Sequence, residues 1–195
     1  QGIDSAAIGT KAEALENESI ALGTQAKALA KYSTALGNQS TAKEELDLAV
    51  GHNANASGGQ STAVGLDSQS IGFASNAIGG ASLAAGDFST AVGHGAKAEA
   101  KSTLAAGQGA TASGKQSTAV GLDSKSTGET SIAIGTTSLA AGDFSTAVGN
   151  GARAEKALDL AVGHKANAAG GQSTAVGRDS QRKGETSIAI GTTSL

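Results

Sequence analysis

The sequence predicts an all-β fold, a parallel β-roll or solenoid of stacked 14-residue coils. Three observations support this. Glycine recurs every 14 residues along the whole chain, a second glycine column follows the first by seven residues, and the residues between the columns alternate with a period of two. Two turn columns in each coil predict two short strands per coil, and each coil is expected to pair with the next through parallel ladders.

The first glycine column fixes the length of the repeat. An aliphatic residue precedes each of its members, with Ala106 the only weak case, and the residue before that is always alanine. Self-similarity at a fixed interval indicates a repeat protein whose units stack on their neighbours. We therefore expect residues 1–195 to form a single domain of about 14 stacked coils. The column consists of Gly9, Gly23, Gly37, Gly51, Gly65, Gly79, Gly93, Gly107, Gly121, Gly135, Gly149, Gly163, Gly177 and Gly191.

The second glycine column marks the other turn of each coil. Glycine reaches a positive φ without steric cost, so both columns are expected to be turns. A glycine about every seven residues also argues against helix, because each would cost about 1 kcal/mol relative to alanine. The members of this column are Gly58, Gly72, Gly86, Gly114, Gly128, Gly142, Gly170 and Gly184.

The period-two alternation predicts which side chains share a face. Ile20 and Leu22 should point one way, and Ser19 and Ala21 the other. We expect the aliphatic residues to fill a narrow interior, opposite the Ala and Ser positions of the second strand. Threonine or an aliphatic residue, as at Thr34, is expected to share that inward face.

The all-alanine column is then expected to face outward. Restriction to one small side chain in every coil predicts that a second copy of the chain packs closely against it, although alanine could also simply fit the pleat of a monomer. The predicted trimer-interface residues are Ala7, Ala21, Ala35, Ala49, Ala63, Ala77, Ala91, Ala105, Ala119, Ala133, Ala147, Ala161, Ala175 and Ala189.

Composition excludes several classes of protein. Aromatic residues make up 2% of the chain, so a core of large side chains is excluded. The net charge of −3 without any Lys/Arg run argues against a nucleic-acid partner and against a polybasic membrane patch. The absence of cysteine excludes disulfides and thiolate metal sites. No apolar stretch of about 18 residues and no signal peptide are present, and the chain begins and ends within a repeat, so any export signal or membrane anchor is expected to lie outside it.

The repeated core of the coils resembles a known family. The pattern S-x-A-[VI]-G-x-x-[AS]-x-A occurs as STAVGLDSQS at 61–70, SIAIGTTSLA at 131–140 and STAVGHGAKA at 89–98. It resembles the head repeat of trimeric autotransporter adhesins of Gram-negative bacteria, of the Yersinia-adhesin type. The resemblance implies a left-handed roll, a homotrimer with two identical chains as partners, display at the bacterial outer membrane, and attachment to host extracellular matrix or cell-surface receptors. Autoaggregation is compatible with it, and contact with the membrane is expected only through an anchor outside this sequence.

Enzymatic and metal chemistry are not expected. GATASGKQ at 109–116 fits a phosphate-loop spacing, but Gln116 stands where Ser or Thr should bind magnesium, and the repeat itself produces the match. Each serine has periodic twins, so no isolated catalytic group is found, and no cofactor is expected. The residues most open to a metal hypothesis are three histidines and three aspartates that recur in turns, and we expect them to be solvated turn residues: His52, His94, His164, Asp67, Asp123 and Asp179.

Two other functions remain as alternatives to adhesion. Stacked threonines suggest an ice-binding solenoid, although they occupy only every second coil and are expected to face inward. An acyltransferase-type β-helix has three strands per turn and six-residue faces, which a 14-residue repeat does not fit. The ligand-binding residues of an adhesin are not defined by the repeat. Long polar side chains near turns are candidates, namely Lys11, Lys97, Lys125, Arg153 and Arg178.

Overall fold

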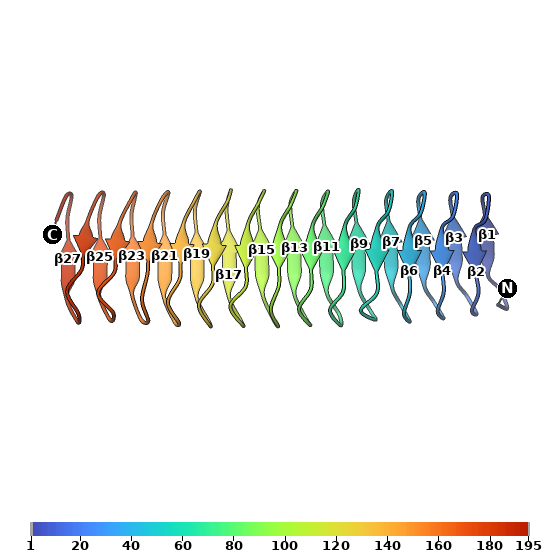
Figure 1. Cartoon of the computed structure of the whole chain (residues 1–195), viewed down its shortest axis with the longest axis horizontal. Coiled ribbons are helices and arrows are strands. Elements are labelled where there is room, and N and C mark those ends of the chain that lie inside the picture. Colours follow the sequence, from blue (N-terminus) through green and yellow to red (C-terminus); the bar gives the residue numbers. More distant parts are fainter. Residues whose placement is uncertain (1, 195) are drawn as a thin grey trace. The chain divides into compact units, whose positions relative to one another are not determined.

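The computed structural model describes residues 2–194, and within this range the chain consists of strands and turns. The all-β prediction is confirmed. Among these residues no helix that could cross a membrane is found. The chain divides into two compact units, Gln1–Ala98 and Glu99–Leu195, and both are built in the same way. In each unit successive coils follow one another in chain order (Figure 1).

Each coil of the first unit contains a three-residue strand and a two-residue strand. The odd-numbered strands form one parallel sheet and the even-numbered strands form another. The odd-numbered strands are β1 (Ala6–Ile8), β3 (Ile20–Leu22), β5 (Thr34–Leu36), β7 (Leu48–Val50), β9 (Thr62–Val64), β11 (Asn76–Ile78) and β13 (Thr90–Val92). The even-numbered strands are β2 (Glu13–Ala14), β4 (Lys27–Ala28), β6 (Thr41–Ala42), β8 (Asn55–Ala56), β10 (Gln69–Ser70), β12 (Leu83–Ala84) and β14 (Lys97–Ala98).

The second unit repeats this alternation of three-residue and two-residue strands, again with parallel pairing between equivalent strands. Its three-residue strands are β15 (Leu104–Ala106), β17 (Thr118–Val120), β19 (Ile132–Ile134), β21 (Thr146–Val148), β23 (Leu160–Val162), β25 (Thr174–Val176) and β27 (Ile188–Ile190). Its two-residue strands are β16 (Thr111–Ala112), β18 (Lys125–Ser126), β20 (Leu139–Ala140), β22 (Arg153–Ala154), β24 (Asn167–Ala168) and β26 (Gln181–Arg182).

The register within each unit pairs every residue with its equivalent 14 residues away. In the first unit Ala21 lies opposite Ala35, and Leu22 lies opposite Leu36. In the second unit Ala133 lies opposite Ala147. Equivalent side chains therefore form continuous ladders within a unit, as the sequence predicted.

The buried side chains of the described coils are Ala, Ser, one Thr and two Asp, and the coil of β26 differs in having the half-buried Arg182 at the inward position. In one coil of the first unit the buried side chains are Ser19, Ala21, Ala26 and Ala28, all with 0% exposure. The predicted Ala and Ser positions of the second strand are therefore confirmed as interior. The prediction that the aliphatic residues fill this interior is wrong, because the outward residues of β3 are the exposed Ile20 and Leu22.

The size of the coil explains the reversal. A strand of three residues and a strand of two, joined by short turns, leave a narrow space between the two sheets. No fully buried side chain among the described residues is larger than aspartate, and nearly all are Ala or Ser. A close-packed interior of this width has no room for Ile or Leu. The larger member of each alternating pair is therefore on the outside.

The two glycine columns have different physical causes. Gly65, in the first column, has a φ of 135°, and a Cβ there would lie 2.6 Å from the carbonyl oxygen of Gly79 in the next coil. Gly72, in the second column, has no positive φ, but a Cβ there would clash with the backbone of Gly86. Close approach of successive coils therefore restricts both columns, and left-handed backbone is required only in the first.

Candidate binding surfaces

The alanine column is not a surface. Its members are fully buried within one chain from Ala21 to Ala175, Ala189 is 5% exposed, and Ala7 is partly buried. A side chain enclosed by its own coil has no contact to offer to a second chain, so the predicted interface role is wrong for this column. The residues concerned are Ala7, Ala21, Ala35, Ala49, Ala63, Ala77, Ala91, Ala105, Ala119, Ala133, Ala147, Ala161, Ala175 and Ala189.

The outward residues of the odd-numbered strands form an uncharged, mostly aliphatic face in each unit, with Thr or Asn at one position of several coils; we call it the apolar face. Several of them are strongly exposed, for example Leu22 at 46% and Ile78 at 42%. Charged residues are absent from this face, which in the first unit consists of Ala6, Ile8, Ile20, Leu22, Thr34, Leu36, Leu48, Val50, Thr62, Val64, Asn76, Ile78, Thr90 and Val92. In the second unit it consists of Leu104, Ala106, Thr118, Val120, Ile132, Ile134, Thr146, Val148, Leu160, Val162, Thr174, Val176, Ile188 and Ile190. A contiguous apolar surface of this extent is typical of a protein-protein interface.

The even-numbered strands present a polar face. In the first unit its outward residues are Glu13, Lys27, Thr41, Asn55, Gln69, Leu83 and Lys97, and in the second they are Thr111, Lys125, Leu139, Arg153, Asn167 and Gln181. Three of the candidate contact residues therefore lie on short strands and not in turns, namely Lys97, Lys125 and Arg153. Most coils are thus amphipathic, with Leu83 and Leu139 as the exceptions on the polar face.

The remaining candidate residues lie in the turns. His52, His94 and His164 are exposed, and no group of three or more potential metal ligands is found among residues 2–194. Asp67 is in a left-handed turn conformation, with a φ of 54°, and its Oδ1 accepts a hydrogen bond of 2.7 Å from Asn53 Nδ2. Arg178 pairs with its neighbour Asp179 at 3.3 Å.

The fold can also be compared with the other kinds of protein considered from the sequence, namely a phosphate loop, an acyltransferase β-helix and an ice-binding solenoid. Residues 109–116 form β16 and its flanking turns, without the strand, loop and helix of a phosphate loop. Two strands per coil do not match the three-stranded turns of an acyltransferase β-helix. The threonines of the odd-numbered strands face outward, contrary to the prediction, and still alternate with other residues from coil to coil, as at Thr62 and Asn76.

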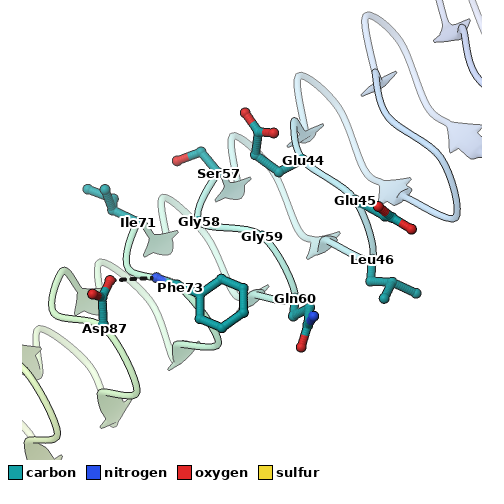
Figure 2. A pocket seen from close by; sticks show the side chains of 10 residues that line it. All are labelled: Glu44, Glu45, Leu46, Ser57, Gly58, Gly59, Gln60, Ile71, Phe73 and Asp87. Carbon is teal, nitrogen blue, oxygen red and sulfur yellow. Dashed lines mark hydrogen bonds between the residues drawn. The ribbon is translucent and has the colours of Figure 1, made fainter.

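A hollow of about 600 Å³ opens over the turn before β9 in the first unit (Figure 2). We call it the first hollow. Its floor is Gly58–Gly59, and the neighbouring coils carry Glu45 and Phe73 at the position of Gly59. It is bordered by the carboxylates of Glu44, Glu45 and Asp87 and by the apolar side chains of Leu46, Ile71 and Phe73.

A buried aspartate shapes the floor of this hollow. Asp47, 1% exposed, occupies a position that is serine in most coils. Its Oδ1 accepts hydrogen bonds from Ser61 N (2.9 Å) and Ser61 Oγ (2.8 Å), and its Oδ2 accepts one from Glu44 N (2.8 Å). In an ordinary coil the equivalent serine N–H donates within its own turn, as Ser75 N does to Gly72 O. The Asp47 carboxylate therefore takes the hydrogen bond of Ser61 N, which in an ordinary coil would go to the carbonyl oxygen three residues earlier in the same turn.

The same device occurs in the second unit. Asp159 Oδ1 accepts hydrogen bonds from Gly171 N (2.9 Å), Ser173 N (2.9 Å) and Ser173 Oγ (2.8 Å). A smaller hollow of about 370 Å³, the second hollow, lies over Gly170–Gly171. Sequence reasoning missed both hollows. An aspartate in the serine column followed by a Gly-Gly pair, twice in the chain, was the signal available.

Comparison with known proteins places the chain in a family. The sequence matches the YadA head domain repeat (two copies) over residues 1–26, 17–40, 42–68, 71–96, 98–124, 126–152 and 154–180. A crystal structure of the collagen-binding domain of Yersinia adhesin YadA is similar at 23% identity, covering 98% of this chain and 82% of that chain, with a TM-score of 0.38. No curated protein sequence matches the chain. Because the repeat covers nearly every coil, the chain belongs to the YadA head domain repeat family and is an adhesin head.

Proposed function

We propose that this head works as a homotrimer at the bacterial surface and attaches the cell to host extracellular matrix or cell-surface molecules. The observation that carries the proposal is the uncharged apolar face of the odd-numbered strands. Exposed Ile78 and Leu22 are costly in water unless another surface covers them. The family resemblance supplies the number of chains, and closed symmetry allows each copy to bury the same face.

The polar face and the turns then remain open to ligands. Three chains with equivalent coils would present one weak contact many times, so avidity would not require a deep pocket. Autoaggregation would use the same surfaces between cells. This function needs no catalytic group, and it places the domain outside the cell on a surface anchor.

Light scattering on the purified chain tests the assembly. We expect three times the mass of one chain. The variant Val64→Lys, on the apolar face, should lower the mass to that of a monomer, because an unpaired charge would be buried in the interface. The matched control Gln69→Lys, on the polar face of the adjoining strand, should leave the mass unchanged. A monomeric wild-type chain would contradict the homotrimer.

Binding to immobilised matrix proteins, collagen among them, tests the adhesive role. We expect saturable binding by the wild-type chain and much weaker binding by the Val64→Lys monomer, since avidity is lost with the trimer. Circular dichroism would confirm that the variant keeps its strands. Equal binding by monomer and trimer would rule out the multivalent mechanism while leaving adhesion itself intact.

A further inference from the structure

The first hollow exists because one position of the turn lacks a side chain. Neighbouring coils carry Glu45 and Phe73 where this coil has Gly59. A Cβ built on Gly59 would lie 3.6 Å from the Phe73 ring and 3.9 Å from Cβ of Glu44. A guest side chain at this point would therefore be in ordinary van der Waals contact with an aromatic ring on one side and an acidic residue on the other.

The walls of the hollow are held in place by the fold. The Phe73 ring packs edge-to-face against Phe88, with centroids 5.6 Å apart and planes at 82°. Asp87 Oδ1 accepts a hydrogen bond of 3.0 Å from Phe73 N, which holds the carboxylate at the backbone of Phe73 (Figure 2). The floor is fixed from below by Asp47, through Ser61. These contacts connect the lining residues to one another and to the coils on either side.

The chemistry of the lining is that of a site for a basic side chain. Three carboxylates border the hollow and no lysine or arginine lines it. Phe73, Leu46 and Ile71 offer apolar contact to an aliphatic stem, and Glu44 lies beside the Gly59 position, where a charged end can meet its carboxylate. Lysine and arginine combine such a stem and charge, and their cations are attracted to the face of an aromatic ring.

The same edge of the first unit already holds one such pair. Lys31 Nζ lies 4.5 Å from the centroid of the Tyr32 ring, one coil before Glu45. The pKa of Lys31 is raised, first by Tyr32 and more weakly by Glu18 and Glu45.

We propose that the first hollow binds a lysine or arginine side chain of a partner protein, with its stem against Phe73 and its charge beside Glu44 and Glu45. This contact is one that the proposed adhesive function could use, but it depends only on the first hollow. The two are therefore tested by different measurements.

The second hollow is a control built into the same chain. It keeps the Gly-Gly floor, the buried Asp159 and Leu158, but Lys156 and Ala157 replace the two glutamates, and Glu185 replaces Phe73. The Gly-Gly turn of the second hollow is like that of the first, with a φ of 87° at Gly171 and 80° at Gly59. The second hollow has fewer carboxylates and no aromatic side chain. We expect it not to bind basic side chains.

Amide NMR spectra of the deuterated full chain test the proposal directly. The probes are acetyl-Gly-Arg-Gly-amide and acetyl-Gly-Lys-Gly-amide, and the control is acetyl-Gly-citrulline-Gly-amide, which has the shape of arginine without its charge. We expect saturable shifts at Gly58 and Gly59 with the two basic probes, little change with citrulline, and no saturable shift at Gly170 and Gly171. Higher salt should weaken the binding.

Two variants complete the test. Glu45→Ala, which copies Ala157 of the second hollow, and Phe73→Leu should each weaken binding by about fivefold, through loss of charge and of the cation-π contact respectively. Neither residue is buried, so folding should be retained, and the mass in solution should not change. Absence of saturable shifts at Gly58 and Gly59, equal shifts in both hollows, or equal binding of citrulline would overturn the proposal.

Discussion

At the scale of single residues, the two buried aspartates are the least expected feature of the coils. Asp47 and Asp159 are 1% exposed in an interior otherwise made of Ala, Ser and Thr. Their carboxylates are satisfied by N–H and O–H donors of their own and the following coil. Because Ser61 N is bonded to the carboxylate, the turn at Gly58–Gly59 opens, and glycine with a φ of 80° at Gly59 accommodates it.

Removing one of these carboxylates should destabilise the unit that holds it. Asp47→Ala leaves the N–H groups of Glu44 and Ser61 without their partner in a buried site. We expect a loss of about 2–4 kcal/mol in the free energy of unfolding. Urea denaturation followed by circular dichroism measures it.

The exposed Asp87→Ala is the matched control, with an expected loss below about 1 kcal/mol. Asp47→Ser, which restores the usual residue of the column, should lie between the two, because a serine hydroxyl can replace only part of the carboxylate's hydrogen bonds. Equal stability of Asp47→Ala and Asp87→Ala would show that the buried carboxylate does not contribute.

At the scale of the strand, the sequence defined two faces but not which one is inside. The 14-residue period, two strands per coil and the interior Ala and Ser of the even-numbered strands were all predicted. The odd-numbered strands were turned the wrong way, because larger side chains are buried in most folds. The all-alanine column indicated the buried position, because a narrow interior restricts the size of a side chain as strictly as a partner chain does.

A pair of substitutions in β9 checks the orientation of these strands. Ala63 is fully buried, whereas its neighbour Thr62 faces outward. Ala63→Leu should destabilise the first unit by about 3 kcal/mol or more, because the coil cannot widen to admit the extra carbons. Thr62→Leu should cost less than about 1 kcal/mol, since leucine is native at the equivalent position 48. Thermal unfolding of the two variants gives the comparison, and the reverse order of stability would restore the original orientation.

At the scale of the whole molecule, the apolar face should make the thermal stability of the chain depend on its association with other copies. A homotrimer that buries the apolar face should unfold at a higher temperature as protein concentration rises, because association favours the folded chains by mass action. Scanning calorimetry over a hundredfold range of concentration measures the shift. A melting temperature independent of concentration would count against association through this face.

The family of the chain could be predicted from the sequence, but the two hollows could not. The repeated cores, STAVGLDSQS at 61–70 and SIAIGTTSLA at 131–140, were enough to predict the repeat and the family. The hollow over Gly58–Gly59 could not be predicted in this way, because it depends on a hydrogen bond between successive coils that begins at Asp47. A change in one coil alters the shape of its neighbour, and a column-by-column comparison of residue types does not show that.

The strict like-with-like register also has a consequence for how such a chain can change in length. Within the first unit Asn76 pairs with Thr62 and Thr90, and Ile78 pairs with Val64 and Val92. Excising residues 66–79 would bring the coils on either side together with every glycine, alanine and aliphatic column still aligned. Loss or gain of a whole 14-residue period therefore preserves the pairing of the remaining coils. Insertion of a single residue into a strand would instead turn its buried side chains outward and its exposed side chains inward.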